Sequence, residues 1–184
     1  MKTENKIISL VICSILALAF SFGIHNLSAV PNSGNADSSG AIHYGSVVCV
    51  WKNGVLVSPC KHNLLTNVGL NMIQLALNGT ASTATGVMLG NGTTIIAPTD
   101  TVLPGLISDS GLVNATGTYV YRGAGAWNVT KSFTSTGNSI GVNMTGLQDT
   151  TTKLLLAEAN FTTTTLQAND VINVTWGIYI TGTQ

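Results

Sequence analysis

Residues 169–180 read NDVINVTWGIYI, and this stretch decides the fold class. After the turn-forming pair Asn169-Asp170, every second residue is apolar. These residues are Ile172, Val174, Trp176, Ile178 and Ile180. Successive side chains of a β-strand point to opposite faces, so a period of two predicts a strand with one buried face. We expect the other face, which carries Asn173 and Thr175, to meet solvent.

The same alternation recurs upstream in shorter segments, separated by turns of Gly, Asn and Asp. It predicts strands at 86–89, 111–121, 127–134, 140–145 and 153–162. Short strands at such spacing are typical of an all-β protein, and we expect an antiparallel, jelly-roll-like β-sandwich. The pattern assigns inward positions to Tyr119, Tyr121, Trp127 and Met144. It assigns an outward position to Glu158.

The clearest helical segment of the chain lies between Thr66 and Gly79. Thr66 or Asn67 can cap its start, and Gly79 can end it. Its apolar stripe consists of Leu70, Met72, Ile73, Leu75, Ala76 and Leu77. We expect this one short helix to plug an end of the sandwich. Residues 99–107, with prolines at 98 and 104, are predicted to form a turn with a helical segment.

Cys49 and Cys60 flank a predicted hairpin centred on Asn53-Gly54, a pair that favours the type I′ turn. A two-residue turn would place Cys49 opposite Ser58. A bridge to Cys60 therefore requires a bend or bulge, which Pro59 favours. In an exported chain we expect the two cysteines to form a disulfide.

Metal sites are the alternative interpretation of these polar residues. One site would combine Cys49, Cys60, His43 and His62, a spacing that matches no established zinc pattern. Another would bind calcium among Asp100, Asp109, Asp149 and Asp170, which lie at predicted turns. Asp at a turn commonly accepts hydrogen bonds from its own backbone, and no calcium-loop spacing is present. We predict no metal and no cofactor.

The N-terminus, residues 1–29, is predicted to be a signal peptide. A mildly basic start precedes the apolar run Ile7–Ile24, and Ala29 fits a signal-peptidase site. The run also reaches transmembrane length, so an uncleaved anchor is the alternative. Residues 30–46 are mostly small and polar, which predicts a flexible arm. The sandwich domain is expected at 47–184.

Seven Asn-x-Thr triplets follow the arm. Their asparagines are Asn78, Asn91, Asn114, Asn128, Asn143, Asn160 and Asn173. This triplet is the acceptor sequence for N-glycans on secreted proteins. An Asn and its Thr share one face of a strand, and we expect that face to point outward. The alternative is that a surface rich in Asn and Thr produces such triplets by chance.

The composition narrows the function. Only 8% of the residues are charged and the net charge is +0, whereas about 25% is typical of soluble domains. Phosphate binding needs clustered Lys and Arg, which argues against nucleic acid as a partner. The sequence contains no nucleophile–base motif, no pair of carboxylates at a spacing typical of catalysis and no phosphate-binding glycine loop. We therefore predict that the protein is not an enzyme. A surface so poor in charge favours self-association unless glycans keep it soluble.

Several short sequence motifs resemble those of known families. Among them are Thr99–Leu103, Lys131–Gly137, Leu154–Phe161 and Asn169–Trp176. Over residues 85–181 they resemble a β-sandwich family of phage tail and virion structural proteins. The export signal and the Asn-x-Thr triplets depart from that family. The whole plan of signal, arm and uncharged sandwich is similar to archaeal extracellular filament subunits of the thread and bundling-pilus type.

In those filament families the N-terminal arm of one subunit completes the sheet of the next. The resemblance therefore implies a homopolymeric, N-glycosylated filament on the cell surface, assembled head-to-tail by donor-strand complementation. The donor-strand candidates are Ile42, Tyr44 and Val47. Surfaces or other cells would be its further partners.

Two alternative functions do not involve a homopolymeric filament. One is a virion or tail-type structural protein. The other is a membrane-anchored or surface-layer adhesion module, in which tryptophans and tyrosines form an aromatic platform. Its tryptophans would be Trp51, Trp127 and Trp176, although the last two fit inward positions.

Overall fold

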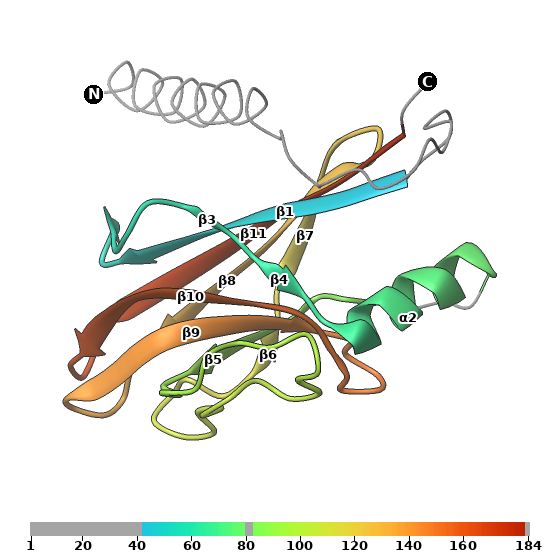
Figure 1. Cartoon of the computed structure of the whole chain (residues 1–184). Coiled ribbons are helices and arrows are strands. Elements are labelled where there is room, and N and C mark those ends of the chain that lie inside the picture. The colour runs from blue at the N-terminus through green and yellow to red at the C-terminus, as the bar shows by residue number, and fades with distance from the viewer. Residues whose placement is uncertain (1–41, 80–82, 183–184) are drawn as a thin grey trace, which may run out of the picture. The chain divides into compact units, whose positions relative to one another are not determined.

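The computed structural model describes residues 42–79 and 83–182, and most of them lie in two antiparallel sheets (Figure 1). The predicted signal segment, residues 1–29, and residues 30–41 of the arm lie outside the described residues. The two sheets are named here by their central strands, the β11 sheet and the β9 sheet.

The β11 sheet contains six strands in the order β2-β1-β11-β8-β7, and β3 also pairs with β1. Their bounds are β1 Ile42–Lys52, β2 Val55–Leu56, β3 Lys61–His62, β7 Thr118–Gly123, β8 Ala126–Thr134 and β11 Val171–Gly182. β1 pairs with β11 along its whole length, from Ile42 opposite Gly182 to Lys52 opposite Ile172. The expected boundary between arm and sandwich, 46/47, therefore falls inside β1.

The β9 sheet contains five strands in the order β4-β10-β9-β5-β6. Their bounds are β4 Leu64–Leu65, β5 Gly86–Gly90, β6 Ala115–Thr116, β9 Ile140–Gln148 and β10 Leu155–Leu166. β10 pairs with β9 antiparallel, with register shifts at Leu155/Ala157 and at Asn160/Thr164. A register shift of this kind marks a β-bulge, which bends the strand and changes which side chains share a face.

The main core lies between the two sheets and confirms the predicted all-β antiparallel sandwich. From β11 it receives Ile172, Val174, Trp176 and Ile178, which are all buried. The strand that decides the fold class thus has the predicted buried face. From the β9 sheet it receives Val87, Leu89, Val142, Leu147, Ala157 and Phe161, among others.

A second apolar cluster covers the outer face of the β9 sheet. It consists of Met88, Leu103, Met144 and Leu155, with Ile96 packed against it. The segment 91–112 crosses this face and forms turns, and it contains no helix. The predicted helical segment at 99–107 is therefore wrong. Pro98 and Pro104 favour turns here, and the bridge between Gly90 and Leu106 ties the segment to the sheet.

Two assignments in the β9 sheet are wrong. Met144 was predicted to share a face with Val142, but Met144 packs in the outer cluster and Val142 packs in the main core. Glu158 was predicted to face solvent, but it is fully buried. Glu158 faces outward, but its strand is covered on both faces, so outward does not mean exposed. Met144 and Val142 lie on either side of the register shift between β9 and β10, and such a shift changes which side chains share a face.

Helix α2 spans Asn67–Leu77 and confirms the predicted helix and its cap. The Thr66 hydroxyl accepts a hydrogen bond from the Gly69 N–H at 2.9 Å. A Cβ at Gly69 would collide with the Leu156 carbonyl oxygen, so the helix lies directly on β10. Only part of the expected apolar stripe is covered: Met72 is buried, whereas Leu70, Leu75 and Leu77 are exposed.

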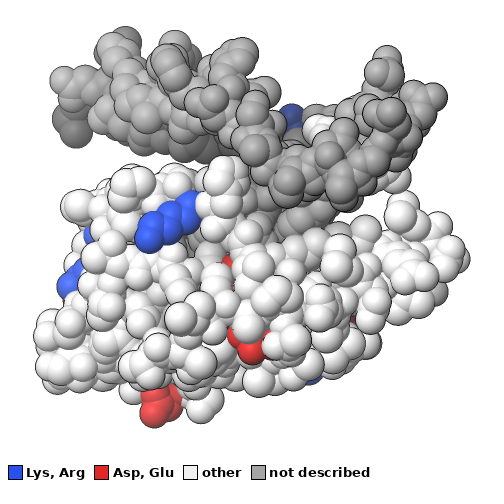
Figure 2. All heavy atoms as spheres, in the orientation of Figure 1, with Lys and Arg blue, Asp and Glu red and all other residues white. Residues whose placement is uncertain are grey.

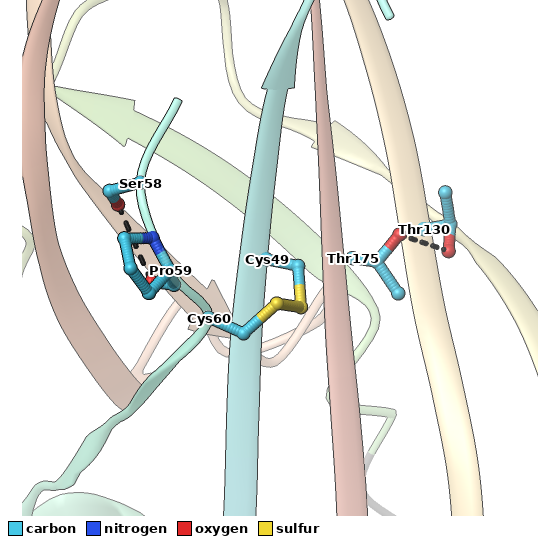
Figure 3. Close-up of a disulfide and its surroundings, with 6 residues drawn as sticks. All are labelled: Cys49, Ser58, Pro59, Cys60, Thr130 and Thr175. Atoms are coloured by element: carbon cyan, nitrogen blue, oxygen red, sulfur yellow. Dashed lines mark hydrogen bonds between the residues drawn. A yellow bond between two sulfur atoms is a disulfide. The ribbon is translucent and has the colours of Figure 1, made fainter. Parts of the chain in front are cut away.

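The hairpin and the disulfide agree with the predictions. Asn53 and Gly54 both have positive φ, 49° and 81°, as a type I′ turn requires. The pairing register shifts between β2 and β3, and the β3 register places Cys60 opposite Cys49. Figure 3 shows the bridge, with an S–S distance of 1.95 Å and Pro59 in the connecting segment. These two cysteines are therefore not metal ligands.

Candidate assembly surface

The two halves of β1 are held differently. From Val47 onward β1 is paired on both sides, with β11 on one side and with β3 and then β2 on the other. The Cys49–Cys60 disulfide fastens the same half. The first half, Ile42–Ser46, has β11 as its only partner strand among the described residues. β1 is thus anchored after residue 46 and held on one edge before it.

The three donor-strand candidates take different positions on β1. Tyr44 packs against the main core, and its hydroxyl oxygen accepts a hydrogen bond from the Asn63 side chain at 3.4 Å. Burial raises the pKa of the Tyr44 phenol above its ordinary value. Ile42 shares the inward side of the strand but is exposed at its end, and Val47 points to the other face. Tyr44 therefore contributes most to the core.

Gly45 completes the contact surface of the first half of β1. It lies opposite Tyr179 of β11, and a Cβ at Gly45 would collide with the Tyr179 ring. The tyrosine ring occupies the space that a side chain at 45 would need. This close approach fixes the pairing of Ile42–Ser46 with β11.

A second unpaired edge lies along β10. β4 pairs only with Ala157 and Glu158, so the rest of β10 has no partner strand on that side among the described residues. Beside it lies an open groove of about 400 Å³, lined by Lys52, Asn53, Val55, Leu56, Val57 and Thr162 to Thr164. Lys52 Nζ donates a hydrogen bond to the Thr165 carbonyl oxygen at 2.7 Å and pairs with Asp170 at 3.0 Å. A lysine across a strand edge discourages pairing with another chain.

A third edge is β7, which ends the β11 sheet. β6 and β7 are nearly continuous, but β6 pairs with β5 and β7 pairs with β8. The chain changes sheets at Gly117, where a Cβ would come within 2.7 Å of the Val129 side chain. After this corner the chain belongs to the β11 sheet and no longer pairs with the β9 sheet. Tyr119 and Tyr121 therefore keep the predicted inward side, yet they are 54% and 65% exposed.

The seven acceptor asparagines differ in accessibility. Asn78, Asn91 and Asn160 are exposed, and Asn114 and Asn173 are half-buried. Asn173 Nδ2 donates to Ser132 Oγ at 2.7 Å. Asn143 Nδ2 donates to the Gly92 carbonyl oxygen at 2.9 Å. These two amides are already engaged within the fold.

Asn128 is the most buried acceptor and corrects the expectation of an outward, exposed residue. It is 3% exposed. With the amide orientation assigned from its hydrogen-bond partners, its oxygen accepts from Arg122 Nε and Nη2 at 3.1 Å and its nitrogen donates to the Trp127 carbonyl oxygen at 3.2 Å. Arg122 of β7 thus covers Asn128 of β8.

Glu158 forms a buried carboxyl pair that the sequence patterns missed. The Ala97 N–H donates to Asp100 Oδ2 at 2.9 Å and to Glu158 Oε1 at 3.2 Å. Burial, and then the hydrogen bond with Asp100, raise the pKa of Glu158 to about 7. Apolar residues precede Glu158 at 154–157 without alternation, and such a run signals a strand covered on both faces.

The other candidate residues do not form a site. His43 and His62 are exposed on β1 and β3, and Trp176 is fully buried while Trp51 and Trp127 are half-buried. Among residues 42–79 and 83–182, no group of three His, Cys, Asp or Glu side chains is placed to hold a metal ion. The same residues include no helix long and apolar enough to cross a membrane. Charged side chains are sparse on the face in Figure 2.

No known protein family, characterised protein or solved structure matches this chain. The disulfide indicates an oxidising, extracellular environment.

Proposed function

We propose that the chain is the structural subunit of a secreted, N-glycosylated cell-surface filament. The observation that carries the proposal is the division of β1, anchored from Val47 onward and held only by β11 before it. The arm of residues 30–46 is donated to the next subunit: its described part, Ile42–Ser46, leaves its own β11 and pairs with β11 of the neighbour. The free subunit keeps Ile42–Ser46 on its own β11, which protects that edge until assembly.

The exchange preserves the contacts that the strand makes in the free subunit. Tyr44 enters the same core position, and Gly45 again lies under Tyr179, now of the neighbour. The backbone ladder supplies affinity, while the tyrosine and the glycine supply register. Because each subunit gives a strand forward and receives one from behind, the contact is head-to-tail and grows into a filament.

Two features favour β11 over β10 as the acceptor. The free edge of β10 is crossed by Lys52 at Thr165, and the exposed acceptor Asn160 lies on the same strand. A glycan there would add bulk beside the edge. β11, by contrast, already offers a complete register to the first half of β1.

An engineered disulfide tests the exchange. His43 lies opposite Thr181 across the β1–β11 ladder, and both side chains are exposed. Cysteines at both positions, His43→Cys with Thr181→Cys, join neighbouring subunits if the strand is exchanged. Non-reducing electrophoresis of assembled material then gives a ladder of covalent oligomers, while isolated subunits give only an internal bridge.

A matched pair controls for random oxidation. His43→Cys with Gly177→Cys is out of register, because Gly177 lies opposite Val47. Four residues of strand separate the positions by roughly 13 Å, beyond the reach of a disulfide. Filaments in which the His43–Thr181 bridge stays within each chain would contradict strand exchange.

A further inference from the structure

We infer that β7 is a second self-association surface, at which two copies pair edge to edge and antiparallel around Val120. This contact is separate from the exchange of β1 and does not depend on it. β7 ends the β11 sheet, and within the described part of the chain its outer edge has no partner strand. All its residues from Thr118 to Arg122 are exposed.

The sequence of β7 matches itself when reversed. Thr118-Tyr119-Val120-Tyr121-Arg122 is nearly palindromic. With Val120 on a two-fold axis, Tyr119 of one copy faces Tyr121 of the other, and Thr118 faces Arg122. Aromatic cross-strand pairs are favourable, and no like charges meet. A two-fold contact needs such a self-complementary strand, whereas an unrelated partner does not.

The inner side of β7 supplies apolar surface for this contact. In the cross-strand row Tyr121–Trp127–Ile178–Ser46, the side chains at β8, β11 and β1 are partly or fully buried, while Tyr121 is exposed. The corner at Gly117 separates β7 from the β9 sheet, and within the described residues this end of the inner face is exposed at Tyr119 and Tyr121. When β7 of two copies pair, the β11 sheet of one copy continues into that of the other. The neighbouring copy then covers part of Tyr119 and Tyr121.

The outer side of β7 is compatible with close approach. Arg122 is turned onto Asn128, which leaves the strand edge without a projecting lysine or a proline. Asn128 carries an acceptor triplet, but its amide is buried and engaged. A glycan on Asn128 would lie beside β7. Because the buried amide cannot carry one, the outer edge of β7 stays accessible to a second copy.

A cysteine on the proposed axis tests the pairing directly. Val120→Cys brings two cysteines face to face, at a Cα separation of about 4.5–5.5 Å in either type of antiparallel pair, which suits a disulfide. Mild oxidation should convert it to a covalent dimer on denaturing, non-reducing gels. Val171→Cys is the matched control, since Val171 is 38% exposed and Val120 39%. It should stay monomeric.

Opposite charges introduced at position 120 test the β7 contact independently of filament growth. The experiment uses subunits in which the engineered disulfide between positions 43 and 181 locks β1 to β11 of the same chain. Such subunits cannot donate the strand. Val120→Lys and Val120→Glu should each weaken self-association by more than about tenfold, because like charges meet on the axis, and their mixture should restore it.

Two results would overturn the inference. One is equal dimer formation by Val120→Cys and Val171→Cys. The other is a locked subunit that stays monomeric while an oligosaccharide quenches its tyrosine fluorescence and Tyr121→Ala abolishes the quenching. That second result would assign the tyrosines to a carbohydrate.

Discussion

At the scale of single residues, the fold separates acceptor asparagines that the sequence makes equivalent. A glycan needs a side-chain nitrogen that is free and faces solvent. Asn78, Asn91 and Asn160 are exposed. The side-chain nitrogens of Asn128 and Asn143 instead donate hydrogen bonds to backbone carbonyl oxygens. The triplet sequence alone carries no information on these contacts. Chain geometry decides which acceptors are compatible with the folded state.

We predict glycans at Asn78, Asn91 and Asn160 and none at Asn128 or Asn143. Glycopeptide mass spectrometry of protein recovered from the source cells measures the occupancy of each site. Changing the three exposed asparagines to Gln should remove most of the mass above the sequence mass and leave the melting temperature nearly unchanged. Gln at 128 or 143 should keep the glycan mass and lower the melting temperature, since a buried hydrogen bond is lost. Glycan on Asn128 in folded protein would refute the assignment.

The Glu158–Asp100 pair makes stability depend on pH. Burial raises the pKa of Glu158 from 4.5 to about 7, so the folded state binds a proton that the unfolded chain releases. This contribution is complete below pH 4.5 and is lost as the pH rises through 7. We therefore expect a higher melting temperature at pH 5 than at pH 8.

Glu158→Gln should flatten this profile and raise the melting temperature at pH 8, because the amide retains the hydrogen bonds without a charge. Asp170→Asn is the control. Hydrogen bonds with Gln167 and Asn53, and then with Lys52, lower the pKa of Asp170 to about 2. Its contribution changes only below about pH 4, so this variant should keep the wild-type slope between pH 5 and 8. A Glu158→Gln profile parallel to wild type would contradict the burial account.

At the scale of elements, contact with a neighbouring strand overrides intrinsic preference in α2. Alanine is favoured over glycine in a helix by about 1 kcal/mol. At Gly69, however, the new methyl group would strike the Leu156 carbonyl oxygen of β10. Overpacking of this kind costs about 1–3 kcal/mol. We predict that Gly69→Ala lowers the free energy of unfolding, as measured by chemical denaturation.

Asn71→Ala supplies the control for this helix, because Asn71 is exposed in the same turn. Its effect should be neutral or slightly stabilising, since propensity then acts alone. A stabilised Gly69→Ala protein would mean that α2 does not lie against β10.

The elements also mark how far sequence patterns reach. Period-two segments such as Val171–Ile180 and Trp127–Thr134 predict strands correctly, because the apolar face of each is packed in the core while the polar face, apart from Asn128, is half-buried or exposed. The Asn53-Gly54 turn is equally local, since two positive φ angles favour those residues. The disulfide was expected from the export signal, and it required a bend near Pro59, because the two-residue turn alone places Cys49 opposite Ser58. The turn and the disulfide join residues that lie close together in the chain.

The wrong assignments share a nonlocal cause. Glu158 and Met144 lie under the segment 91–112, which covers the second face of the β9 sheet. Tyr119 and Tyr121 lie beyond the corner at Gly117, where β7 pairs with β8 alone among the described strands and both tyrosines are exposed. Alternation specifies the face of a side chain only where the strand has no register shift, and Met144 lies beside one. What covers that face depends on segments distant in sequence, and alternation contains no information about them.

At the scale of the whole molecule, the charge is too sparse to keep many copies apart. With 8% charged residues and a net charge of +0, electrostatic repulsion between copies is weak. The strand edges then decide which contacts form. Lys52 crosses the edge of β10, the first half of β1 covers the edge of β11, and the outer edge of β7 has no partner strand among the described residues. Under our proposals, the exchange of β1 builds the filament and β7 joins copies laterally.

Electron microscopy of unheated, non-denatured material from the cell surface tests the central claim most directly. We predict filaments with a regular subunit repeat. In their density map, the chain should pass between subunits before Val47, so that Ile42–Ser46 lies on β11 of the neighbour with Tyr44 in its core. Single particles, or filaments in which Ile42–Ser46 stays on β11 of its own subunit, would contradict strand donation.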